Sequence, residues 1–343
     1  MDLQKVGWLK KITAKQIAMM CILMVAVYFL ATPPRAGNEL ESDNVIMTIR
    51  GLDDLFTAPI NEHTLYVMHD SGHLVKTTVM ANPEMSEVDS IFNSLLVDSD
   101  NLHDGVFGLI PSGAVLRNYE IVDGILTLDL SESFTWYKTS VEQNLLTSLV
   151  WSMTALNDVD HVNFLVEGEP VNNFNTALHV GRGLNRAMGI NVEMDAQSMA
   201  NTKPIMLYFF TDQTEDALLV PVTRLVDPHV DPFEIVISSL VRGPLSGSYI
   251  SVFNHQASLI EAPFIDEGIM TLNFSSNLFY DLDQTQVSSQ VIKQLVMSMT
   301  EFEEVTEVSV VIEGNSRVFD NVGNPITIPV GRNHVLGNET ASY

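Results

Sequence analysis

Two arginines occur in the same short context in a chain that has few of them. Arg182 and Arg332 each follow a Val-Gly pair, and the chain carries 17 lysines and arginines against 43 aspartates and glutamates. A guanidinium group can hold a carboxylate through two parallel hydrogen bonds. Arg182 and Arg332 are therefore our candidates for binding a partner's carboxylate, with a local salt bridge as the structural alternative.

Two glutamates also occur in matching places. Glu167 and Glu313 each stand before a glycine at the end of an apolar run. An acid that transfers a proton in catalysis needs a second acid or a base held nearby. No second acid, histidine or serine recurs consistently with them, and Asp129 in the first context becomes Asn273 in the second. The pattern favours a turn at the end of a strand over a catalytic site.

One cluster of histidines has a metal-like composition. His63, His69 and His73 lie near Asp70, and His69 and His73 flank a short turn where they could meet a shared ion. The corresponding positions later in the chain are Thr211 and Ala217. Solvated turn residues are the favoured interpretation, and we predict no metal.

No familiar catalytic motif is present. The sequence lacks Gly-x-Ser-x-Gly, Gly-x-x-x-x-Gly-Lys and His-Glu-x-x-His, and its single cysteine is Cys21. Late in two helical patterns, the pairs Ser152/Thr154 and Ser298/Thr300 are expected to bond back to helix carbonyls. We predict no catalytic residues, no cofactor and no enzyme activity, with a cell-wall hydrolase as the enzymatic alternative.

A domain-sized stretch of the chain occurs twice. The run 124–131, Gly-Ile-Leu-Thr-Leu-Asp-Leu-Ser, returns at 268–275 as Gly-Ile-Met-Thr-Leu-Asn-Phe-Ser. Other segments return in the same order, roughly 145 residues later. Solenoid repeats have periods of about 20–50 residues, so this period indicates two tandem domains.

The second copy shows the clearer pattern of elements. Apolar runs, alternation and caps predict a hairpin, a helix begun by Asp231-Pro232 and ended by Gly243-Pro244, a second hairpin, a long helix and a final strand. Pro221 is expected to place its strand at a sheet edge. The expected ranges are 205–210, 218–225, 231–242, 257–265, 269–274, 287–299 and 308–312.

The first copy follows the same order, with expected ranges 65–69, 74–80, 86–97, 115–121, 125–130, 141–156 and 162–166. The predicted fold class is α+β, with two tandem two-layer sandwich domains of order β-β-α-β-β-α-β after an N-terminal transmembrane helix. Met153 and Met299, late in the long helices, are expected to be buried against a sheet.

The N-terminus predicts a membrane anchor. Lys5, Lys10, Lys11 and Lys15 precede an uncharged run, 16–32, which is just long enough to span a bilayer. Lysines on this flank place it in the cytoplasm and the rest of the chain outside. A cleaved signal peptide is the alternative interpretation. A lipoprotein leader at Cys21 is disfavoured.

The charge of the chain excludes some partners. A formal net charge of −26 repels nucleic acid, anionic lipid and anionic wall polymer. We predict no nucleic acid partner. A platform for wall glycan would use aromatic residues such as Trp136 and Tyr137.

The two copies resemble the GerMN domain of the GerM-like sporulation and spore germination family of spore-forming bacteria. The resemblance rests on Leu-Tyr-Phe-Phe at 207–210, Ser-Leu-Val-Arg-Gly-Pro at 239–244, the 268–275 run and Val-Val-Ile-Glu-Gly at 310–314. The first copy departs from it, with Val-Asp-Ser-Asp at 97–100. The resemblance implies membrane-tethered tandem domains without established catalytic residues, and a role in assembling an extracytoplasmic complex.

The expected organisation is a cytoplasmic N-terminus (1–15), a transmembrane anchor (16–32), a stalk (33–63), a first GerMN-like domain (64–191), a linker (192–204), a second GerMN-like domain (205–338) and a tail (339–343). We therefore expect a single-pass cell-membrane protein with its domains outside. Its expected function is to bind or scaffold envelope proteins in a sporulation or germination complex, with peptidoglycan or wall-glycan binding as the alternative.

Overall fold

The computed structural model describes residues 62–171, 174, 182–195, 201–214, 216–279, 286–315, 318–321, 323, 325–326 and 328–337. Residues 61–343 form one compact unit. The expected anchor at 16–32 and the stalk up to residue 61 lie outside the described residues. Within the described ranges, no helix has both the length and the apolarity needed to cross a membrane.

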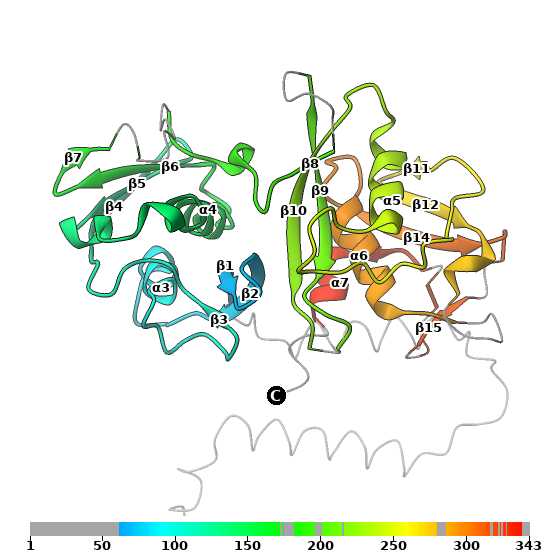
Figure 1. Cartoon of the computed structure of the whole chain (residues 1–343), viewed down its shortest axis with the longest axis horizontal. Helices are drawn as coiled ribbons and strands as arrows, with labels where there is room; N and C mark the ends of the chain where they lie inside the picture. Colours follow the sequence, from blue (N-terminus) through cyan, green and yellow to red (C-terminus); the bar gives the residue numbers. More distant parts are fainter. Residues whose placement is uncertain are drawn as a thin grey trace, which may run out of the picture. The chain divides into compact units, whose positions relative to one another are not determined.

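The first copy contains the expected elements in the expected order (Figure 1). They are β1 (Glu62–His69), β2 (Leu74–Met80), α3 (Glu87–Ser94), β3 (Val106–Phe107), β4 (Leu116–Val122), β5 (Ile125–Leu130), α4 (Glu142–Met153), β6 (His161–Val166) and β7 (Glu169–Pro170). Short 3-10 turns η2 (Glu132–Thr135), η3 (Thr139–Val141) and η4 (Arg186–Met188) and the strand β8 (Glu193–Met194) complete it.

The second copy repeats this order. Its elements are β9 (Lys203–Phe210), β10 (Leu219–Val226), α5 (Pro232–Arg242), β11 (Phe264–Asp266), β12 (Ile269–Phe274), η5 (Ser276–Leu278), β13 (Gln286–Val287), α6 (Ser289–Met299), β14 (Glu307–Ile312), β15 (Phe319–Asp320), β16 (Val330–Gly331) and α7 (Arg332–Gly337). The strand expected over 257–265 is shorter than predicted, because the β11 ladder begins only at Phe264.

The helix ends follow from capping chemistry. At the start of α5, the Asp231 carboxylate accepts hydrogen bonds from the backbone N–H groups of Phe233 and Glu234, and Pro232 occupies the first turn. At its end, Gly243 adopts a φ of 88°, a conformation that costs glycine little. These caps fix the length and direction of α5.

The layers differ from the two-layer sandwich that we expected for each copy. In each copy the first hairpin and the second group of strands belong to separate sheets, β4-β5-β6-β7 in the first and β11-β12-β14-β16 in the second. Helix α4 contacts both β1 and β6, and all side chains from Leu145 to Met153 are buried. Because these side chains are all buried and α4 contacts strands of two separate sheets, α4 lies between two β layers.

Both methionines behave as predicted. Met153 in α4 and Met299 in α6 have no exposed surface. Helix α6 contacts β9 and β14, which repeats the arrangement of α4 against β1 and β6.

The prediction that Pro221 marks an edge strand is wrong. Strand β10 pairs with β9 along one side, and on the other with β2 at Leu219 and with β8 at Arg224 and Leu225. Pro221 lies between these two pairings, where the Asn191 side chain donates to its carbonyl at 2.8 Å. A proline without an N–H is tolerated inside this sheet because a side chain takes the place of a paired strand.

Serine hydroxyls from the buried helices satisfy the outer backbone of β1 and β9. The N–H of Tyr66 donates to Ser152 Oγ at 2.9 Å, and that of Tyr208 donates to Ser298 Oγ at 3.0 Å. Ser148 also donates to the Tyr66 carbonyl at 2.5 Å. A buried backbone N–H without an acceptor is costly. The two serines therefore allow a helix to pack directly against a strand edge.

We expect Ser152→Ala and Ser298→Ala each to lower the free energy of unfolding by about 1–3 kcal/mol, because each leaves a buried N–H without its acceptor. Urea unfolding of the full chain measures this. Ser238→Ala, on the exposed side of α5, is the matched control and should change stability by less than about 0.5 kcal/mol. Equal stabilities for the core and control variants would contradict this role.

Candidate functional site

Arg332 binds the end of helix α6. Its Nε donates to Thr300 Oγ1 at 3.0 Å, and its Nη2 donates to the Met297 carbonyl at 2.9 Å and to Glu301 Oε1 at 2.6 Å. The guanidinium also lies over the Tyr208 ring, 5.7 Å from its centroid. A cation that hydrogen-bonds the last carbonyls of a helix also complements the helix dipole.

The counterpart of Arg332 in the first copy is Arg186, so the sequence match between Arg182 and Arg332 is corrected. Arg186 donates from Nε to Thr154 Oγ1 at 2.9 Å and from Nη2 to the Trp151 carbonyl at 3.2 Å. Both arginines lie 32 residues after their threonine. Arg182 is exposed. The constant Thr-to-Arg spacing was the signal in the sequence that could have identified Arg186.

The partners of Arg332 hold it in the charged form. Burial acts to lower the pKa of Arg332, but the neighbouring Tyr208 and Glu301 outweigh it and raise this pKa above its ordinary value. Burial raises the pKa of Tyr208, whose hydroxyl donates to Glu301 at 2.9 Å. The local salt bridge expected as the alternative for Arg332 is present, with Glu301 as its partner.

Glu167 and Glu313 occupy tight turns. They adopt φ values of 52° and 50°, and each accepts a backbone N–H at the start of a 3-10 turn, from Glu132 at 3.0 Å and Ser276 at 3.2 Å. Asp129 accepts from Gly168 N at 2.9 Å, and Asn273 accepts from Gly314 N at 3.3 Å. One side-chain oxygen is enough for this contact, which explains why asparagine can replace aspartate.

The histidines lie in different environments. His63 is buried, contrary to the solvated position that we expected. The His69 ring forms a hydrogen bond with the Ser71 hydroxyl. His73 packs edge-on against Tyr249, with 4.7 Å between the ring centroids. Burial lowers the pKa of His73. Within the described ranges, no three His, Cys, Asp or Glu side chains are placed to share a metal ion.

The two aromatic residues considered for glycan stacking also differ. Trp136 is 71% exposed, whereas the Tyr137 hydroxyl donates to Glu142 at 2.8 Å. Burial and this hydrogen bond raise the pKa of Tyr137. Only Trp136 offers a free ring face.

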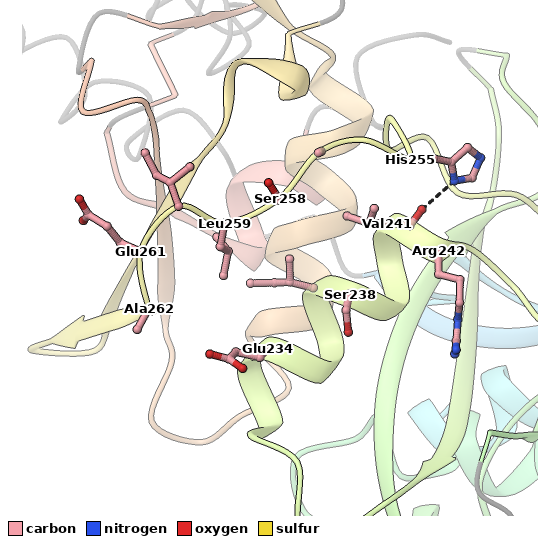
Figure 2. A pocket seen from close by; sticks show the side chains of 12 residues that line it. Glu234, Ser238, Val241, Arg242, His255, Ser258, Leu259, Glu261 and Ala262 are labelled. Atoms are coloured by element: carbon pink, nitrogen blue, oxygen red, sulfur yellow. Dashed lines mark hydrogen bonds between the residues drawn. The ribbon is translucent and has the colours of Figure 1, made fainter.

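A groove in the second copy was not foreseen from the sequence. It lies between α5 and the segment 255–262, has a volume of about 690 Å³, and is shown in Figure 2. Its apolar lining comes from Ile237, Val241, Ala257, Leu259, Ile260 and Ala262, and its polar lining from Glu234, Ser238, Arg242, His255, Ser258 and Glu261.

The groove coincides with an irregularity beside β11. Leu259 pairs with Phe274, and Phe264 pairs with Thr271. The paired positions therefore lie five residues apart on the first segment, but only three apart on β12. The two extra residues form a bulge that follows Ile260, whose N–H still donates to the Asn273 carbonyl of β12. The corresponding strand of the first copy, β4, pairs with β5 over its whole length with one smaller register shift.

The ends of the groove carry opposite charges, because α5 and the 255–262 segment run in opposite directions. Glu234 and Glu261 lie at one end, and Arg242 and His255 lie at the other (Figure 2). Arg242 forms an ion pair with Asp195, and His255 Nδ1 donates to the Val241 carbonyl at 2.8 Å. Asp195 compensates the charge of Arg242 at the basic end. The uncompensated charge of the groove therefore lies at its acidic end, on Glu234 and Glu261.

A buried ion pair fixes the end of α5. Arg224 is fully buried and donates to Glu193 Oε2 from Nε at 3.0 Å and from Nη2 at 2.6 Å. Its Nη2 also donates to the carbonyl of Gly243 at 3.0 Å. The other oxygen of Glu193 accepts from Tyr249 at 2.6 Å and from Leu245 N at 2.9 Å. Glu193 thereby ties the segment between the copies to the helix that lines the groove.

The environment of Glu193 favours its ionised form. Burial acts to raise the pKa of Glu193, but the hydrogen bonds from Tyr249 and Arg224 and the charge of Arg224 lower it below its usual value. Glu193 is therefore held in its ionised form beside Arg224.

Comparison with known proteins identifies the family. The family model described as Germane, sporulation and spore germination, matches residues 64–172 and 206–318. These two matches cover more than half of the chain, so this protein belongs to that family of sporulation and spore germination proteins.

Two relatives agree with this assignment. The spore germination protein GerM of Bacillus subtilis (strain 168) is 26% identical over 277 residues, which is 78% of this chain and 76% of the relative. The solved structure of the tandem GerMN domains of the sporulation protein GerM from Bacillus subtilis matches with a TM-score of 0.71 and 25% identity, covering 79% of this chain and 97% of that chain. The α+β fold and the tandem GerMN domains predicted from the sequence are confirmed.

We expect Arg332→Ala and Arg186→Ala each to lower the free energy of unfolding by about 1–3 kcal/mol, because each removes hydrogen bonds from a charged group to a helix end. Arg182→Ala, at an exposed position, should change it by less than about 0.5 kcal/mol. Denaturant unfolding measures all three. If Arg182→Ala lowered the free energy of unfolding strongly and Arg186→Ala did not, Arg182 would be the counterpart of Arg332 after all.

The Glu193–Arg224 pair predicts a loss of stability in acid. A carboxyl whose folded pKa is depressed contributes stability that is present above its unfolded pKa, near 4.3, and lost as the pH falls through the lower folded value. Unfolding midpoints should therefore fall as the pH drops below about 5. In Glu193→Gln this component should be absent.

At pH 7, Glu193→Gln should cost about 3–5 kcal/mol, because it leaves Arg224 buried without a counter-charge. Asp195→Asn is the matched control, since its partner Arg242 is half exposed and such pairs contribute about 1 kcal/mol or less. Similar losses for the two variants would contradict the importance of burial.

Proposed function

We propose that this protein is a non-enzymatic, membrane-anchored, extracytoplasmic binding and scaffold protein of a bacterial sporulation or germination complex. The observation that carries the proposal is membership of the sporulation and spore germination family over both copies. The anchor is inferred from the lysine flank and the uncharged run 16–32.

The use of the repeated polar residues supports a non-enzymatic role. Within the described part of the chain, Ser152 and Ser298 bind strand backbone, Arg186 and Arg332 bind helix ends, and the Glu167 and Glu313 pair binds backbone N–H groups. These groups are occupied by structural contacts in both copies. Catalysis by a general acid and a general base would need at least one copy in which such a pair is free.

A membrane-impermeant crosslinker added to intact protoplasts tests the proposal. We expect it to join the chain reproducibly to a small set of envelope proteins, because the domains lie outside the membrane and act by binding protein. Adding the crosslinker after lysis is the control for access. Capture only after lysis would contradict the extracytoplasmic location.

The alternative is binding to peptidoglycan or another wall glycan, which the exposed ring of Trp136 favours. Sedimentation of the purified chain with isolated cell wall tests it, with Trp136→Ala as the matched variant. Tight, saturable and Trp136-dependent sedimentation without any captured protein would replace the scaffold by a glycan-binding function. Release of soluble wall fragments would make the protein an enzyme.

A further inference from the structure

We propose that the groove between α5 and residues 255–262 is the docking site for an extended, apolar peptide segment of a partner protein, with a basic residue at one end. This rests on the proposed binding function and names the surface and the chemistry that it uses. Three features of the groove carry it: an exposed apolar lining, backbone groups left unpaired by the bulge, and uncompensated acidic side chains at one end.

The lining gives the driving force. Val241 and Leu259 are half-buried, and Ile260 is 49% exposed, so apolar surface faces water along the groove. Phe264, at the start of β11, is 63% exposed. Removing such surface from water stabilises a complex by about 25 cal/mol per Å². A contiguous exposed apolar surface rimmed by polar residues is typical of binding sites.

The backbone beside the groove suits an extended partner. Ile260 N donates to the Asn273 carbonyl, but for Glu261 and Ala262 no backbone hydrogen bond is made within the described residues. Strand β11 is an edge of its sheet, β11-β12-β14-β16. Edge strands and adjoining extended segments bind peptides by adding a strand, with main-chain hydrogen bonds supplying affinity and side-chain pockets supplying specificity.

The length of the groove limits the length of the segment. From Glu234 to Arg242 the helix rises about 12 Å at 1.5 Å per residue. Extended chain covers that distance in about four residues at about 3.3 Å each. Alternate side chains of such a segment would face Ile237, Val241 and Leu259.

The charges set the orientation. Glu234 and Glu261 are both exposed at one end, and neither has a basic partner among the described residues. At the other end the charge of Arg242 is compensated by Asp195. A lysine or arginine of the partner beside the two glutamates would complement their charge. The strong net negative charge of the whole chain also favours a basic partner.

Selection from a phage-displayed library of random twelve-residue peptides on the immobilised full-length protein tests the proposal. We expect enriched peptides to share about two apolar residues at alternating positions within a stretch of about four residues, next to a lysine or arginine. Synthetic versions should bind the full chain at least tenfold more weakly after Ile260→Asp. They should also bind at least tenfold more weakly to the double variant Glu234→Lys and Glu261→Lys.

The matched control is Glu120→Lys, an exposed charge reversal on β4 of the first copy, which should leave peptide affinity unchanged. The changed residues are exposed, and unfolding midpoints verify that each variant folds. Repeating the selection on the double variant should enrich acidic residues in place of basic ones.

Failure to enrich any consensus would overturn the proposal, as would selected peptides whose affinity the groove variants do not change. These outcomes differ from failure of the proposed function. Envelope proteins still crosslinked equally to wild type and to the groove variants would show that the scaffold function holds and that the docking surface lies elsewhere.

Discussion

The structure depends on how the edges of β1 and β9 are satisfied where no further strand can pair along their full length. Ser152 and Ser298, which are fully buried in α4 and α6, supply acceptors for the edge N–H groups. Without these hydroxyls, packing a helix against a strand edge would bury unpaired backbone groups. Arg186 and Arg332 then bind the ends of the same helices. Serine, threonine and arginine together fix each central helix between its two β layers.

Both copies keep these serine, threonine and arginine contacts, while other parts of the two copies differ. The Asp129-to-Asn273 change keeps the one oxygen that the turn needs, so the turn tolerates it. The first strand of the second sheet is less constrained, since a bulge there disturbs only an edge. In the second copy that bulge opens the groove, whereas β4 in the first copy pairs with β5 with only one smaller register shift. The repeated residues therefore account for folding, and the differences between the copies account for the candidate binding surface.

Much of the fold was predictable because periodicity and capping act locally. The helix begun by Asp231-Pro232 and the buried Met153 and Met299 followed directly from pattern. The layers were not predictable, since the burial of α4 is a tertiary property and its periodicity does not say which strands cover it. Arg186 was missed because its equivalence with Arg332 lies in the contact with Thr154, while the neighbouring letters favour Arg182. The groove depends on strand register, which is a tertiary property.

Glu193 and Asp195, in the segment between the two copies, contact residues at the end of α5, the helix that lines the groove. Glu193 and Arg224 form a buried, charged pair whose hydrogen bonds reach Gly243 and Leu245 at the end of that helix. Asp195, two residues further on, compensates Arg242 at the basic end of the groove. A buried pair with well-placed hydrogen bonds is weak evidence for added stability but good evidence for a fixed geometry. The same segment that joins the copies therefore holds α5 in place and leaves Glu234 and Glu261 as the charges that a partner meets.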